Sequence, residues 1–192
     1  DLRLLNWEPL PINPKNIDAV ILTHAHIDHS GYIPRLIKDG FRGKIYCSSG
    51  TFDLCQILLP DSGYLQEEDA YAANRYGYSR HKIALPLYTE AEARESLEYF
   101  QIVEFDKAFH IADDIYFTLS HSGHILGSSF INIFAGTKNI VFSGDLGRLD
   151  DPLMRNPVNI ESADYLLIES TYGNRLRSKE DPLKQIAEVI NK

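Results

Sequence analysis

Short runs of apolar and β-branched residues alternate with polar stretches along the chain and predict strands. These runs cover residues 19–23, 44–47, 102–105, 115–119, 130–134, 139–143 and 165–169. Helical patterns lie between several of them, over 33–38 before Gly40, over 51–59 up to Pro60, and over 67–76 before Gly77. The alternation predicts an α/β domain built of layers with mixed sheets, in which residues 60–97 form a mostly helical insertion.

Two further helices are predicted from their start signals. Thr89 and Glu92 have the spacing of a capping box, in which each side chain satisfies a backbone N–H near the other residue. Near the end of the chain Ser178 is a candidate N-cap, followed by Pro182 and by apolar residues at helical spacing. That helix ends where the sequence ends, and the sequence begins with Asp1 rather than Met. We therefore expect a piece of a larger protein.

The composition is that of an ordinary globular protein. With 192 residues, 44% hydrophobic and 24% charged, the chain can bury one substantial core. Its 19 Lys and Arg against 27 Asp and Glu give a net charge of −8, which excludes a globally basic surface for non-specific nucleic-acid binding. The argument is weak against an enzyme, because acidic residues that hold two divalent cations would change the local sign of the charge.

The sequence also bears on compartment. The longest apolar runs, such as 165–168, are far shorter than the roughly 20 residues that cross a bilayer, and no charged-then-apolar leader opens the chain. Cys47 and Cys55 have the spacing of neither a CxxC redox pair nor a zinc knuckle. We expect two reduced cysteines, no membrane partner and a cytoplasmic location.

Residues that bind metals or move protons follow several of the predicted strands. Because sites in α/β proteins collect at the carboxyl ends of strands, four such ends are expected to converge on one cleft. The residues concerned are His24, His26, Asp28 and His29 after the first strand, His121 and His124 after 115–119, Asp145 after 139–143, and Glu169 after 165–168.

The first of these clusters has the spacing of a metal site. His24 and His26 are two residues apart at a strand end, so both imidazoles point the same way and can share one cation. Asp28 and His29 lie on the turn into the next helix and can face a second cation. Nitrogen and carboxylate donors without thiolates suit Zn²⁺, with Mn²⁺ or Fe²⁺ as alternatives. The rival interpretation is a set of solvated loop histidines.

Other residues have weaker signals. His81 and His110 stand alone and are expected to be surface or structural histidines. Five basic residues could touch a phosphate backbone, although a solvated face explains them more often: Arg148, Arg155, Arg175, Arg177 and Lys179. Four tyrosines of the helical insertion could stack on bases, although helix packing explains them equally well: Tyr64, Tyr71, Tyr76 and Tyr78.

Four motifs together resemble the ordered signature of the metallo-β-lactamase superfamily, in its β-CASP nuclease branch. They are HAHIDHSG at 24–31, GHILGSS at 123–129, SGDLG at 143–147 and ESTYGNR at 169–175, and the resemblance extends from about Asn6 onward. HxHxDH alone would also fit glyoxalase II-like thioesterases or tRNase Z. ESTYG together with GHILGS points to RNA-processing members such as RNase J and the endonuclease subunit of the pre-mRNA cleavage complex. DNA-repair members usually have an Asp-Thr-Thr type sequence at that place.

The resemblance implies roles for these residues. It assigns His24, His26 and His124 to one zinc, Asp28 and His29 to the other, and Asp145 as a carboxylate that bridges both. Asp28 and Asp145 would also orient the attacking water. Glu169 matches the acidic residue that holds a general-acid histidine, which would lie beyond Lys192. His121 would then be a neighbour of the ligands or face the substrate. Tyr172 and Gly173 would position Glu169.

The resemblance also implies the architecture and the activity. The expected fold is an αββα sandwich, incomplete at both ends, with residues 1–192 as its central part and a β-CASP cap after 192. The expected activity is hydrolysis of RNA with water activated by two zinc ions, and a homodimer is a further expectation. The alternatives are a DNA nuclease, a small-molecule hydrolase on the same fold, or an inactive scaffold subunit of an RNA-processing complex. The isolated piece is expected to bind its first metal better than its second and to be a poor nuclease.

Overall fold

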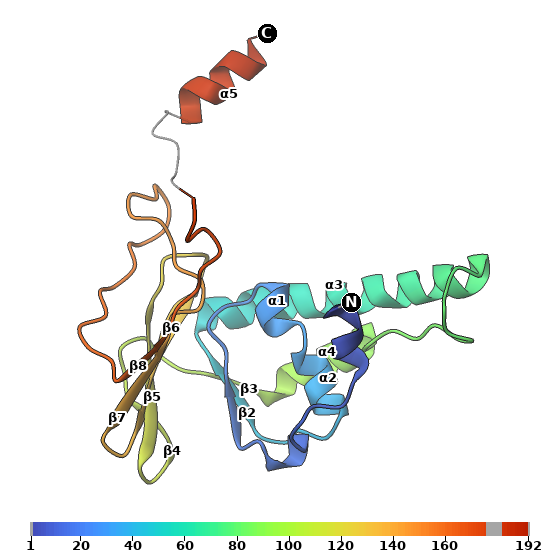
Figure 1. Cartoon of the computed structure of the whole chain (residues 1–192), viewed down its shortest axis with the longest axis horizontal. Helices are drawn as coiled ribbons and strands as arrows, with labels where there is room; N and C mark the ends of the chain where they lie inside the picture. Colours follow the sequence, from blue (N-terminus) through green and yellow to red (C-terminus); the bar gives the residue numbers. More distant parts are fainter. Residues whose placement is uncertain (1, 176–181, 192) are drawn as a thin grey trace.

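The computed structural model describes residues 2–175 and 182–191. Three layers follow one another across the molecule: a group of helices, a three-stranded sheet and a five-stranded sheet (Figure 1). The mixed α/β class is thereby confirmed, and these layers are the first three of the predicted αββα sandwich.

The first sheet is parallel, with the order β1 (Ala19–Ile21), β2 (Lys44–Cys47) and β3 (Phe100–Ile102). Parallel neighbours need a crossover connection, and helices supply it here. These are α1 (Ile27–Ser30) and α2 (Ile33–Lys38) between β1 and β2, then α3 (Ser49–Tyr76) and α4 (Glu90–Ser96) between β2 and β3. Short 3₁₀ turns cover Leu2–Trp7, Pro14–Asn16 and Leu97–Tyr99.

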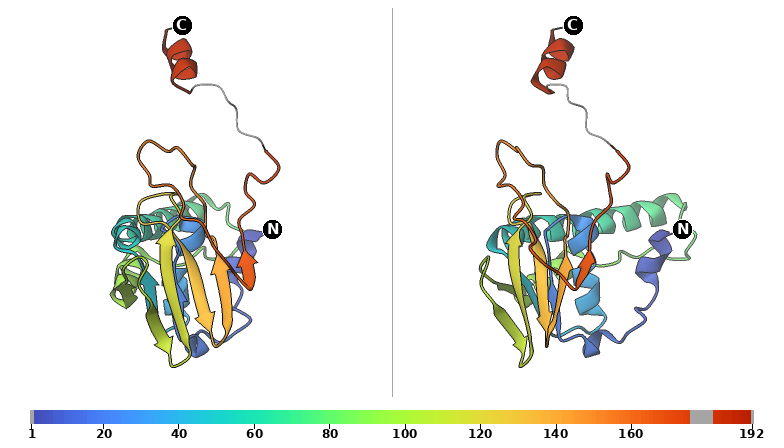
Figure 2. Two further views of the ribbon diagram at one scale, coloured as in Figure 1. Left: turned by 90° about the vertical axis from the view of Figure 1, so that its left-hand side faces the viewer. Right: turned by 60° about the vertical axis from the view of Figure 1, so that its left-hand side comes forward.

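The second sheet runs in chain order, as the two views of Figure 2 show. Its strands are β4 (Phe109–Ala112), β5 (Ile115–His121), β6 (Ser129–Ala135), β7 (Lys138–Phe142) and β8 (Tyr165–Leu167). The first four pair antiparallel, and β8 lies parallel to β7. A last helix, α5 (Pro182–Ile190), follows the residues outside the described part.

Two apolar cores hold the layers together. One lies between the helices and the first sheet and includes Phe41, Ile45 and Leu59. The other lies between the two sheets, where Phe117 of β5 packs with Tyr46 of β2. Because each sheet buries one face in the inter-sheet core, the carboxyl end of β1 is held beside the loops of the second sheet.

Several predicted elements needed correction. Residues 51–59 and 67–76 belong to one helix, because α3 continues through Pro60, which is buried against the core. Packing stabilises this helix beyond what local propensity gives, although proline removes one backbone hydrogen bond. At Gly63 a Cβ atom would collide with the backbone of Thr89 and Glu90, so the glycine allows α3 and α4 to approach closely.

The third strand was predicted at 102–105 and lies at Phe100–Ile102, and the edge strand Phe109–Ala112 was missed. Burial explains the shift, because Val103 and Phe105 face the inter-sheet core after the chain has left the first sheet. The first strand ends at Ile21, two residues earlier than predicted.

Three helix predictions agree with the structure. The capping box of Thr89 and Glu92 is present, with both hydrogen bonds formed. Helix 33–38 has the predicted bounds. The C-terminal helix is confirmed from Pro182 on, whereas its predicted N-cap, Ser178, lies outside the described residues.

Candidate metal centre

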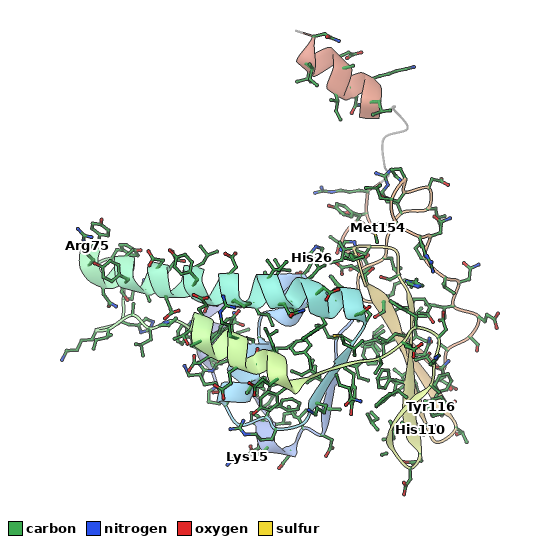
Figure 3. All side chains as sticks on the ribbon, turned by 180° about the vertical axis from the view of Figure 1, so that it is seen from behind. Lys15, His26, Arg75, His110, Tyr116 and Met154 are labelled. Carbon is green, nitrogen blue, oxygen red and sulfur yellow. The ribbon has the colours of Figure 1, made fainter. Side chains whose placement is uncertain are left out.

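The predicted strand ends meet at one edge of the two sheets. The backbone N–H and the hydroxyl of Ser129, at the start of β6, both donate to the carbonyl oxygen of Thr23, at distances of 2.8 and 3.0 Å. These bonds join the end of β1 to the second sheet. His24 and His26 follow directly, and Figure 3 shows His26 at this junction, far from His110 at the other end of the second sheet.

Four side chains gather there with their donor atoms turned toward one another. Nδ1 of His26 lies 3.1 Å from Nε2 of His24 and 3.1 Å from Nε2 of His124. Oδ2 of Asp145 lies 3.3 Å from Nε2 of His124 and 3.6 Å from Nε2 of His24. One donor atom from each of these four residues falls within 4.8 Å of the other three.

These separations suit a single ion. Four ligands about 2.0–2.1 Å from a zinc ion in tetrahedral geometry lie about 3.3 Å from one another. The four measured separations, from 3.1 to 3.6 Å, bracket that value. Three imidazole nitrogens and a carboxylate oxygen are also donors that zinc accepts.

A second group of donors, Asp28 and His29, lies beside the first, with the ring of His29 4.1 Å from that of His24 between centroids. The Oδ1 atom of Asp145 lies 3.4 Å from Nε2 of His29, and that nitrogen lies 3.6 Å from Oδ2 of Asp28. Asp28 is far more open, with 77% of its side chain exposed. The carboxylate of Asp145 thus reaches both groups, whereas Asp28 and His29 stand outside the four-residue group.

Burial keeps the imidazoles of His24 and His124 neutral. The pKa of His24 is lowered to about 3 by its burial and by the neighbouring imidazoles of His29, His124 and His26. The pKa of His124 is also lowered, mainly by burial, although the carboxylate of Asp145 opposes the shift. A neutral imidazole keeps the lone pair that a cation needs, so both rings are ready to bind one at neutral pH.

Thr23 fixes the orientation of His24. Its Oγ1 atom lies 3.1 Å from Nδ1 of His24, on the side of the ring opposite the cluster. When Nδ1 carries the proton and donates it to the hydroxyl, Nε2 is left with its lone pair facing His26 and Asp145. Thr23 was not among the predicted site residues, although a hydroxyl residue directly before the first histidine was the available signal.

Glycines bring His124 beside Asp145. Gly147 packs on the backbone of Gly123, where a side chain would collide, and its N–H donates to the carbonyl oxygen of Ser122 at 2.7 Å. The hydroxyl of Ser128 accepts hydrogen bonds from the backbone N–H groups of His124 and Ile125. Gly123 belongs to the motif GHILGSS and Gly147 to the motif SGDLG. The close approach of their backbones explains why glycine stands at these two positions.

Glu169 lies next to the centre and is held as a carboxylate. Its Oε1 atom accepts a hydrogen bond from the backbone N–H of Leu146 at 2.8 Å. That bond lowers its pKa most, with help from Thr171 and from His124. A cavity of about 190 Å³ opens beside it and is lined by Asp145, Glu169 and Tyr172, among others.

The remaining candidates take other places. The ring of His121 stacks on Phe105, with 3.8 Å between ring centroids, and stands outside the four-residue group. His81 and His110 are exposed, as predicted. Arg148 lines the cavity beside Glu169, Arg155 and Arg175 are exposed, and Arg177 and Lys179 lie outside the described residues. Cys47 and Cys55 are both free and buried.

The fold and this donor set define a class of protein, a metal-binding α/β sandwich whose site lies at the strand ends. Residues 2–181 match the family profile described as a beta-lactamase superfamily domain. The chain therefore belongs to the metallo-β-lactamase superfamily, whose members characteristically bind metal.

The similarity extends to named relatives. A ribonuclease from Thermus thermophilus, ribonuclease TTHA0252, is 29% identical over 188 residues, which are 97% of this chain and 39% of the relative. The transcription termination factor FttA of Cenarchaeum symbiosum is 33% identical over 189 residues, 96% of this chain and 26% of the relative. The factor FttA of Methanosarcina mazei is 35% identical over 173 residues, which are 87% of this chain and 24% of the relative. The resemblance to the β-CASP RNA nucleases is confirmed, and the chain spans well under half the length of these relatives.

The long helix α3 raises the question of membrane insertion. Within the two described stretches, every helix is too short or too polar to cross a bilayer.

Proposed function

We propose that the protein hydrolyses phosphodiester bonds of RNA with water activated by two bound cations. The observation that carries the proposal is the four-residue group of His24, His26, His124 and Asp145, in which four of the six donor separations are close to the edge of a zinc tetrahedron and all six lie within 4.8 Å. Bound cations would lower the pKa of a water from 15.7 towards about 7 and offset charge on the phosphate.

Each side chain has a role in this proposal. His24, His26 and His124 hold the first cation, while Asp28 and His29 hold the second. Asp145 would serve both cations, since one of its carboxylate oxygens lies near His29 and the other near His124. Asp28 and Asp145 also orient the attacking water through hydrogen bonds to their carboxylates.

The leaving oxygen needs a proton, and Glu169 supplies part of that machinery. Its pKa is held low by the N–H of Leu146, so it stays ionised and is a poor proton donor itself. We propose that Glu169 holds a protonated histidine from the part of the protein beyond Lys192 and that this histidine delivers the proton. The cavity beside Glu169 and Tyr172 gives such a side chain room to enter.

Zinc is the metal we propose, with Mn²⁺ or Fe²⁺ as alternatives. Three imidazoles and one carboxylate favour zinc at the first position. The second group, with carboxylates of Asp28 and Asp145 and the imidazole of His29, is poorer in nitrogen and more exposed. We therefore expect the second cation to bind more weakly.

RNA is the proposed substrate because relatives that match nearly all of the chain are named as a ribonuclease and as transcription termination factors. A DNA nuclease or a small-molecule hydrolase could use the same centre. An inactive scaffold subunit is disfavoured by one observation, because all six predicted ligand positions carry residues that bind metals.

The rest of the protein enters as a proposal too. We propose that residues 1–192 form the central part of the metallo-β-lactamase domain and that a β-CASP cap follows, which fits the length of the relatives. The free, buried state of Cys47 and Cys55 supports a reducing, cytoplasmic location. A homodimer stays a prediction.

A cleavage assay on matched strands tests the proposal. The full-length protein that contains this chain is purified and incubated with RNA and DNA oligonucleotides of one sequence, before and after chelation and with Zn²⁺ or Mn²⁺ restored. We expect metal-dependent cleavage of RNA that Asp145→Asn abolishes. Preference for DNA, or cleavage that survives both chelation and Asp145→Asn, would contradict the proposal.

A further inference from the structure

A groove begins beside Asp28 and runs along α3. Two cavities of about 520 and 630 Å³ adjoin there, and they share Trp7, Gln66, Asp69 and Leu87 in their walls. The nearer cavity reaches Asp28, one of the proposed ligands, and the farther one reaches His81. We call the two together the α3 groove.

The helix itself explains why the groove is hollow. Ser62, Gln66, Ala70 and Ala73 line it from one face of α3, at the spacing of successive turns. The small side chains of Ala70 and Ala73 leave space where larger ones would pack. From Ser62 to Ala73 this face is about 17 Å long. At the 3.4 Å spacing of a stacked strand, that length accommodates about five nucleotides.

The opposite wall is a segment that returns from the far end of α3, as Figure 1 shows for residues 77–89. Two side chains of α3 hold it in place. The amide of Asn74 donates to the carbonyl oxygen of Ala84 and accepts from its N–H, at 2.9 and 2.8 Å. Gln66 accepts from the N–H of Leu87 at 3.1 Å. These hydrogen bonds attach the returning segment to α3 at two points.

Trp7 stands where the two cavities meet. Trp7 is 47% exposed, whereas tryptophan is highly buried on average in folded proteins. The guanidinium of Arg35 lies 6.0 Å from the ring centroid, near the limit of a cation–π contact that would help to hold the ring. An exposed, positioned ring in a groove is a platform on which a base can stack.

Charge is divided along the groove in a way that suits a single strand. Arg80 and Lys82 flank His81 at the far end, and all three are exposed. Asp69 lies in the shared part, where its carboxylate would repel phosphates and would accept hydrogen bonds from the amino groups of bases. Bases would therefore face the groove, and phosphates would face outward toward the basic end.

We propose that the α3 groove binds the single-stranded stretch of RNA next to the cleaved phosphodiester, with one base stacked on Trp7 and the backbone near Arg80 and Lys82. The inference rests on the proposed function, because the groove is assigned to RNA through its continuity with Asp28. An apolar peptide would gain nothing from the basic side chains at the far end of the groove, whereas the phosphates of a strand would be attracted to them.

Binding is measured without cleavage. The protein is stripped of metal by chelation and titrated into a labelled ten-nucleotide single-stranded RNA, and fluorescence anisotropy gives the affinity. We expect Trp7→Ala to weaken binding about five- to one-hundred-fold. Trp7→Phe keeps a flat ring and should restore most of the affinity. Lys82→Glu should weaken binding and reduce its dependence on salt.

Two controls make the result specific. Tyr71→Ala removes an exposed ring on α3 that lies outside both cavity walls. This variant should bind RNA as the wild type does. Trp7 is the only tryptophan of the 192 residues, so the emission difference between the wild type and Trp7→Phe reports on this ring. RNA should quench that difference signal, and circular dichroism verifies that each variant is folded.

The outcomes separate the two proposals. Unchanged affinity of folded Trp7→Ala, or no quenching of the Trp7 signal, overturns the groove even if the protein cleaves RNA. Binding that depends on Trp7 in a protein without metal-dependent cleavage supports the groove as an RNA site and overturns the proposed function alone. Equal loss of affinity in Tyr71→Ala and Trp7→Ala also counts against the groove.

Discussion

Asp145 and His29 come within 3.4 Å of each other, from Oδ1 to Nε2, while the other oxygen of the same carboxylate lies 3.3 Å from His124. One side chain thereby approaches nitrogen donors of both groups. Asparagine has nearly the same shape as aspartate but carries no charge. Replacing Asp145 by asparagine therefore tests both groups of donors with one substitution.

The first prediction concerns Asp145→Asn. We expect this variant to bind less metal at both positions and to lose RNA cleavage by at least about 100-fold, because one bridging charge serves both cations. Elemental analysis and the cleavage assay measure the two effects on one preparation. His110→Ala, an exposed histidine at the far end of the second sheet, is the matched control and should leave both unchanged.

The second prediction separates the two positions. His26→Ala should remove the more tightly held cation, because Nδ1 of His26 lies 3.1 Å from two other donors. Asp28→Ala should remove only the weaker one, since its carboxylate is open and lies 3.6 Å from the imidazole of His29. Metal content after dialysis distinguishes the two variants. Equal losses would contradict a difference in affinity between the positions.

The third prediction concerns Thr23, which orients His24 through Nδ1. Thr23→Val removes the hydroxyl and keeps the branched shape, and we expect about 10- to 100-fold weaker metal binding. Thr23→Ser restores the hydroxyl and should recover most of the affinity. A competition titration with a zinc indicator gives the numbers. Equal affinities in Thr23→Val and the wild type would show that the hydroxyl has no orienting role.

The fourth prediction concerns Glu169→Gln. The amide oxygen can still accept from Leu146, so the fold and the metal content should stay the same. Cleavage should fall by about 10- to 100-fold, and the alkaline limb of its pH profile should move, because a histidine without its carboxylate partner loses its proton at lower pH. An unchanged profile would assign Glu169 a purely structural role.

The fifth prediction concerns the metal-free protein in acid. Unfolded His24 takes up a proton near pH 6.5, whereas the buried residue has a pKa of about 3, so protons favour the unfolded state between these values. The free energy of unfolding should fall by about 2 kcal/mol between pH 6.5 and 5 from this residue. Urea unfolding at several pH values measures it. His24→Gln should lose that share of the pH dependence.

Local patterns in the sequence determined much of this protein. The apolar runs predicted the strands 44–47 and most of 115–121, 129–135 and 138–142, because short runs of apolar and β-branched residues are a local signal that needs no tertiary information. The capping box at Thr89 is likewise a contact between residues three apart. The motifs likewise indicated which histidines and carboxylates belong to one centre.

Only the tertiary structure decided where these groups meet and how the chain reaches them. Proline at position 60 is a local signal to end a helix, and packing of α3 against the core overrode it. The partnership of Thr23 with Ser129 joins residues 106 positions apart, and the contact of Gly123 with Gly147 depends on two loops of one sheet. The α3 groove exists because residues near 7, 66 and 84 are brought together by folding. Sequence patterns record the neighbours along the chain, whereas a binding site is set by neighbours in space.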